Sequence, residues 1–102
     1  MIEVTEEMIE KWKEEYSAVY RIRLPDPEFT VYFRPLTRPE YMSTAQQAIL
    51  GAIKDGELEI VKLCILNEIP ENLFENRPGV VTVVHDHVMA KSGFVTVDCE
   101  EL

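Results

Sequence analysis

The most informative part of the chain is residues 20–41, which read YRIRLPDPEFTVYFRPLTRPEY. Apolar and polar residues alternate over 20–24 and again over 29–34, the period of two that is typical of half-buried β-strands. The Pro-Asp-Pro-Glu sequence at 25–28 interrupts regular structure and favours a turn. The sequence therefore predicts a β-hairpin over residues 19–34.

A helix is predicted before the hairpin, over residues 5–18. Thr5 can cap its N-terminus, and the acidic residues that follow are favourable beside the positive end of the helix dipole. Apolar residues then recur at steps of three and four, which is typical of an amphipathic helix. These residues are Met8, Ile9, Trp12 and Tyr16.

The chain after the hairpin is predicted to be helical over residues 38–93. Residues 37–40, Thr-Arg-Pro-Glu, match a capping box that begins one helix. Asp55-Gly56 is expected to end or bend that helix. Residues 58–66 are apolar on most sides, which favours a largely buried helix, and residues 71–77 are expected to form a loop.

The last helix is predicted over residues 78–93. Four valines within residues 80–84 would also suit a strand. The apolar spacing continues up to Gly93, where a left-handed cap is favoured, so helix is preferred and strand stays open for residues 80–88. Residues 94–102 are expected to form an extended arm with an acidic end.

These elements predict an α+β fold in which a β-hairpin packs against three to four α-helices, because an isolated hairpin is marginal in water. A length of 102 residues is that of a single domain, residues 1–102. Its parts are an N-terminal helix within 1–18, the hairpin, the helical part and the arm.

The charge of the chain argues against several partners. Lys and Arg total 10 and Asp and Glu total 19, so the net charge is −9. We expect neither nucleic acid nor an anionic membrane to bind, since both are polyanions. No apolar segment is long enough to cross a bilayer. Two cysteines set no disulfide framework, which suits a reducing cytoplasm.

Metal-ligand chemistry is concentrated at His85, Asp86 and His87. On a helix the two histidines would point about 200° apart, whereas on a strand they would share a face. The chain has no nucleophile elbow and no glycine-rich phosphate loop. We therefore expect no enzymatic activity, no metal and no cofactor. A metal-dependent hydrolase that uses these three residues is the alternative of another class.

Two short motifs carry a family resemblance. They are Tyr-Phe-Arg-Pro-Leu-Thr-Arg-Pro-Glu-Tyr at 32–41 and Met-Ala-Lys-Ser-Gly-Phe at 89–94, and an acidic amphipathic helix precedes them. Across nearly the whole chain, this pattern resembles small tail proteins of tailed bacteriophages. That group is tail assembly chaperone-like and includes baseplate and hub components of contractile tails.

The resemblance implies a protein that works through contacts with phage tail or baseplate proteins, without catalysis. It implies a place in the host cytoplasm during assembly, and in the virion if the protein is structural. A tail assembly chaperone that is absent from the mature virion is the alternative.

Binding residues are expected on the polar face of the hairpin and on the arm. Arginine and tyrosine are enriched at interfaces, exposed strand edges invite strand addition, and the arm alternates apolar and polar residues. Pairing of the hairpin arginines with glutamates of the first helix stays open as the alternative. We expect self-association or docking onto a tail protein through Arg21, Arg23, Tyr32, Arg34, Phe94, Val95 and Val97.

Overall fold

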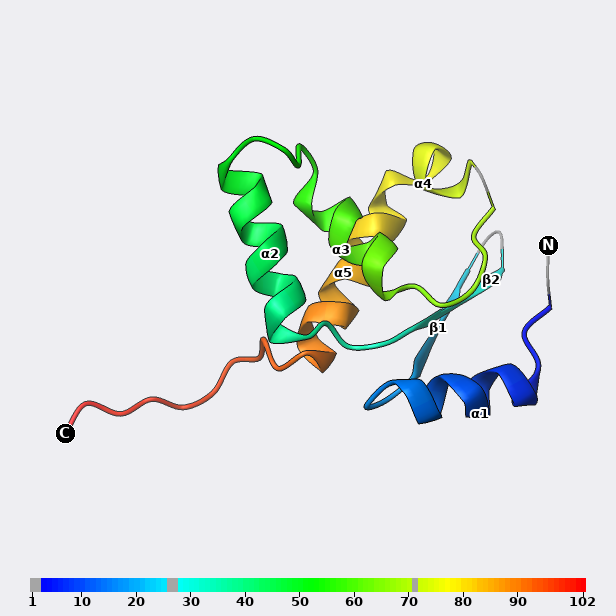
Figure 1. The fold of residues 1–102 in the computed structure, drawn as a ribbon, viewed down its shortest axis with the longest axis horizontal. Helices are drawn as coiled ribbons and strands as arrows, with labels where there is room; N and C mark the ends of the chain where they lie inside the picture. Colours follow the sequence, from blue (N-terminus) through cyan, green and yellow to red (C-terminus); the bar gives the residue numbers. More distant parts are fainter. Residues whose placement is uncertain (1–2, 26–27, 71) are drawn as a thin grey trace.

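The order of elements follows the α+β prediction (Figure 1). The computed structural model describes residues 3–25, 28–70 and 72–102. The predicted turn at 25–28 lies in part outside these residues. The elements are α1 (Glu6–Glu15), β1 (Tyr20–Leu24), β2 (Phe29–Phe33), α2 (Arg38–Ile49), α3 (Gly56–Cys64), α4 (Leu73–Asn76) and α5 (Pro78–Lys91).

The hairpin is confirmed, and its apolar face forms one wall of the core. β1 and β2 pair antiparallel with Tyr20 opposite Phe33. Leu24, Val31 and Phe33 therefore point to the same face, and all three are buried. Helices α3 and α5 pack against each other and cover this face. They bury Ile60, Val61, Cys64, Val81, Val84 and Val88 in the same core.

Helix α1 lies against the other face of the hairpin. The ring of Trp12 lies 5.9 Å from the ring of Tyr32, whose side chain points away from the core. None of the residues of α1 is fully buried. The hairpin is therefore a middle layer, with the core helices on one side and the half-buried α1 on the other.

Helix α1 begins at its predicted cap but ends early. The Thr5 hydroxyl accepts a hydrogen bond from the Met8 N–H at 3.2 Å. The helix ends at Glu15 because Tyr16 adopts extended backbone angles (φ −119°, ψ 159°). This conformation sets the Tyr16 ring under the Arg34 guanidinium, 5.0 Å away.

The capping box of α2 is confirmed, whereas the predicted end of that helix is wrong. The Glu40 N–H donates to the Thr37 hydroxyl at 3.4 Å, and the Thr37 N–H donates to the Glu40 carboxylate at 3.1 Å. The helix ends at Ile49, and Gly51 takes a positive φ of 79°. Asp55 instead caps the N-terminus of α3.

Residues 80–88 are helical, which settles the alternative that the sequence left open. Val81, Val84 and Val88 recur at helical spacing and are buried on one face of α5. The predicted loop at 71–77 contains the short helix α4, because the buried side chain of Leu73 anchors a helical turn to the core. Within the described residues, no helix has the length and apolar character needed to cross a membrane.

Candidate functional site

The outer edge of β2 is covered by the segment that follows α3. The Arg34 N–H donates to the Cys64 carbonyl at 3.0 Å, and the Leu66 N–H donates to the Tyr32 carbonyl at 2.8 Å. Residues 64–66 therefore run beside β2 like a short third strand. The prediction that the helix continues through residue 66 is wrong, because these backbone groups bond to β2 instead.

Asn67 continues this coverage with its side chain. Its Oδ1 accepts from the Tyr32 N–H at 2.9 Å, and its Nδ2 donates to the Thr30 carbonyl at 2.9 Å. The carboxamide thus satisfies one donor and one acceptor of the strand, as a backbone amide would. The outer edge of β2 has no room for a further strand along these residues.

The opposite edge of the hairpin, formed by β1, is open. Tyr32 and Thr30 direct their backbone groups away from β1, so their cross-strand partners Arg21 and Arg23 direct theirs away from β2. Among the described residues, no backbone group pairs with these N–H and C=O groups of Arg21 and Arg23. The edge of β1 is therefore available for strand addition.

Arg21 of the β1 edge borders a groove between α1 and the hairpin. Arg21 and Arg23 are exposed. The groove has a volume of about 600 Å³ and carries both signs of charge. Its lining includes Glu6, Glu10 and Lys13 from α1, and Tyr20, Arg21 and Tyr32 from the hairpin.

Arg34 does not lie exposed beside Arg21 and Arg23, so the prediction that its side chain points outward is wrong. Its side chain is only 11% exposed and forms two parallel hydrogen bonds of 2.7 Å with the carboxylate of Glu40. It also donates to the Leu63 carbonyl at 3.1 Å. Its acidic partner comes from α2, not from the N-terminal helix.

The pair is tightly coupled electrostatically. Hydrogen bonds from Arg34 hold the pKa of the Glu40 carboxyl at about 2, well below its ordinary value of 4.5. The same contact raises the pKa of Arg34. Both groups are therefore charged throughout the neutral range, and the pair links the residue directly after β2 to α2.

The C-terminal arm starts at a fixed point and then leaves the body of the molecule (Figure 1). The Leu36 N–H donates to the Ser92 hydroxyl at 2.8 Å, and the Phe94 ring lies 4.9 Å from the ring of Tyr41. Phe94 therefore packs against α2 at the start of the arm, and 48% of its surface stays exposed.

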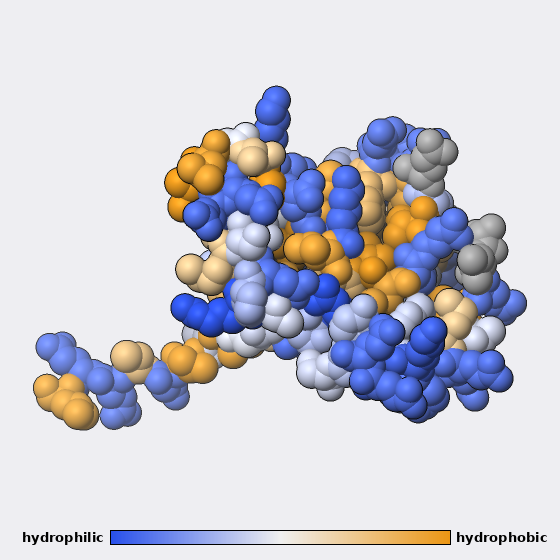
Figure 2. Space-filling view, in the orientation of Figure 1, coloured by the Kyte–Doolittle hydropathy of each residue, from blue (hydrophilic) through white to orange (hydrophobic). Residues whose placement is uncertain are grey.

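The residues beyond Phe94 extend away from the body in Figure 2, where apolar and hydrophilic groups follow one another along the arm. Val95 is 57% exposed and Val97 is 73% exposed. These two predicted binding residues are therefore accessible on the arm.

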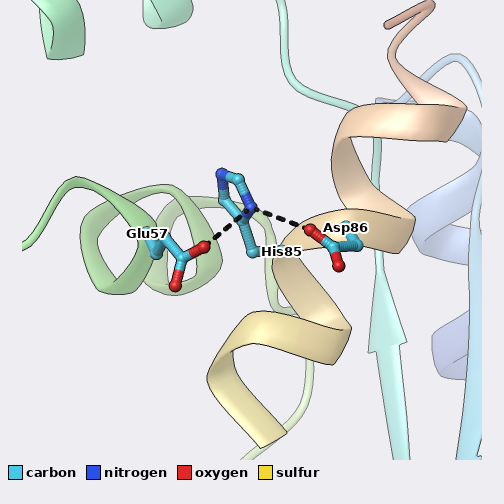
Figure 3. Close-up of side chains that lie close together, drawn as sticks. All are labelled: Glu57, His85 and Asp86. Atoms are coloured by element: carbon cyan, nitrogen blue, oxygen red, sulfur yellow. Dashed lines mark ion pairs between the residues drawn. The ribbon is translucent and has the colours of Figure 1, made fainter. Parts of the chain in front are cut away.

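The predicted set of His85, Asp86 and His87 does not come together. Helix α5 directs His87 to solvent, away from His85. Glu57 of α3 lies there instead, with its Oε2 3.5 Å from His85 Nδ1, and Asp86 Oδ1 lies 3.5 Å from the same nitrogen (Figure 3). Sequence spacing gave no sign of Glu57, because only the packing of α3 on α5 brings it close.

Comparisons with known proteins establish the fold and nothing beyond it. No family model and no curated protein matches the chain. A solved structure of an uncharacterised protein from Bacillus stearothermophilus is similar, with a TM-score of 0.67 and 23% sequence identity. The similarity covers 90% of this chain and 98% of that protein, so the chain shares this α+β architecture over most of its length.

Proposed function

We propose that the protein is a tail or baseplate protein of a tailed bacteriophage and acts by binding other proteins. The observation that carries the proposal is the presence of two complementary features in one chain, the open β1 edge and the projecting arm. The phage assignment rests on the resemblance of residues 32–41 and 89–94. These two motifs contact each other through Leu36 with Ser92 and through Tyr41 with Phe94, which fits a shared structural unit.

The binding step that we propose is strand addition between copies of the chain. Val95 and Val97 alternate with polar residues, as a strand that adds to a sheet edge requires. The arm ends in Asp98, Glu100 and Glu101, whereas the β1 edge carries two exposed arginines. The attraction between the acidic arm and the two arginines favours binding at the β1 edge. The rest of the surface is mostly acidic and would repel the arm.

An arm that one copy donates to the edge of the next makes a heterologous contact. Contacts of this kind close into rings or continue as filaments. The proposed contact therefore supports assembly into a larger structure, and an open filament also leaves the edge of its first copy and the arm of its last copy available to a tail protein.

Light scattering on size-separated protein tests the proposal. We expect the full chain to form particles of several times 11.8 kDa, and a chain that ends at Phe94 to remain monomeric. The double variant Arg21→Ser, Arg23→Ser should also weaken assembly. The matched control, Lys54→Ser with Arg77→Ser, removes two exposed charges elsewhere and should assemble normally. Monomeric full chain, or equal assembly of all variants, would contradict the proposal.

The site of action is tested on purified phage particles. A structural protein stays with the purified particles in fixed stoichiometry. A tail assembly chaperone, the alternative, is found with tail proteins in infected cells but not in the particles.

A further inference from the structure

Three side chains with metal-binding groups meet where the N-terminal turn of α3 lies against α5 (Figure 3). His85 Nδ1 lies 3.5 Å from Glu57 Oε2 and 3.5 Å from Asp86 Oδ1. The three ligand atoms all lie within 4.8 Å of one another. This set is independent of the β1 edge and of the arm.

The spacing of these atoms fits a single ion. Zinc binds histidine nitrogen and carboxylate oxygen at about 2.0–2.2 Å, so two ligands of a tetrahedral zinc lie about 3.4 Å apart. Both separations from His85 Nδ1 already have this value within a tenth of an ångström or so. The Glu57 and Asp86 side chains are 44% and 72% exposed, so they have the freedom to close the third separation.

Two further features favour metal binding at this site. His85 Nδ1 is buried and has no hydrogen-bond partner, which is uncommon for a buried polar atom and leaves it directed at the two carboxylates. The Thr82 hydroxyl donates to Glu57 Oε1 at 3.0 Å, which orients the carboxylate and leaves Oε2 facing His85. Hydrogen bonds of this kind hold metal ligands in position.

We propose that Glu57, His85 and Asp86 bind one divalent transition-metal ion. An imidazole nitrogen with two carboxylate oxygens suits zinc, cobalt or nickel better than magnesium or calcium, which favour oxygen ligands alone. Water completes the coordination, since the carboxylates lie at the surface. The ion bridges α3 and α5, and because it binds the folded chain, it stabilises the fold.

Titration of the full chain with cobalt chloride and with zinc chloride tests the proposal. The Cys99→Ser variant is used so that the exposed thiol cannot bind the ion. Cys64 does not compete, because burial raises the pKa of its thiol to about 11. We expect one ion per chain, visible as a cobalt absorption band, and a higher melting temperature with zinc.

Matched variants locate the ion. Glu57→Gln and His85→Gln should each weaken binding by at least about tenfold, whereas His87→Gln, on the exposed face of the same helix, should leave affinity unchanged. Glu57 is at the surface, so Glu57→Gln keeps the test valid if His85→Gln fails to fold. No stoichiometric binding, or equal loss in the Glu57→Gln and His87→Gln variants, would overturn the proposal.

Discussion

Arg34 contacts several elements of the fold, although the alternation of residues in the hairpin predicts an exposed side chain. From its position directly after β2, the Arg34 guanidinium reaches Glu40 on α2, the Leu63 carbonyl on α3 and the ring of Tyr16 after α1. Removing one partner of a half-buried ion pair is costly, because the other charge then loses its compensation. The contacts of Arg34 therefore indicate a role in the stability of the fold.

The contribution of Arg34 is measurable. We expect Arg34→Ala to lower the free energy of unfolding by about 2–3 kcal/mol, as loss of charged hydrogen bonds predicts. Arg38→Ala, at an exposed position of α2, should have little effect. Urea unfolding followed by circular dichroism measures both. Equal stability of the two variants would show that the contacts of Arg34 contribute nothing.

Glu40 makes this stability depend on pH. Its pKa is about 2 in the folded chain and 4.5 ordinarily, so its contribution is complete above pH 4.5 and is lost as the pH falls toward 2. We expect wild type to exceed Glu40→Gln in unfolding free energy at neutral pH, with the difference shrinking over that interval. Unfolding curves at several pH values test this, and a constant difference would contradict it.

At the scale of elements, the sequence predicts what local residues determine. The alternation over 20–24 and 29–33, the Thr5 cap and the box at 37–40 all depend on neighbours along the chain, and the structure has all of them. The cover on β2 by residues 64–67 depends on contacts between distant segments. Periodicity therefore predicted the hairpin but not which of its edges stays open.

The same limit applies to the candidate sites. Alternation predicted correctly that Arg21 and Arg23 are exposed. It predicted incorrectly that Arg34 is exposed, because the segment between β2 and α2 brings Glu40 to Arg34. Glu57 was missed for the related reason that α3 and α5 meet only in the folded chain.

Asn67 gives a test of the third, strand-like segment. We expect Asn67→Ala to lower the free energy of unfolding by about 1–3 kcal/mol, because it leaves the Tyr32 N–H and the Thr30 carbonyl without partners. Asn67→Asp should retain the bond from Tyr32 but place a carboxylate against the Thr30 carbonyl, so it should also destabilise. Chemical unfolding measures the effect, and wild-type stability of both variants would exclude this role.

At the scale of the whole molecule, the arm explains an extended shape. The radius of gyration is 15.1 Å, whereas a compact chain of this length has about 13 Å. The longest extent, 51 Å, exceeds the other two of 30 and 25 Å. An arm with exposed valines held outside the body makes a binding segment accessible, which is the basis of the proposed assembly.

Hydrogen exchange at the β1 edge tests this assembly most directly. The amides of Arg21 and Arg23 point outward, whereas the amide of Ile22 lies in the ladder with β2 and serves as internal reference. We predict that Arg21 and Arg23 are protected in the full chain and exchange rapidly in the chain that ends at Phe94, with Ile22 protected in both. Rapid exchange of Arg21 and Arg23 in both chains would contradict strand addition at this edge.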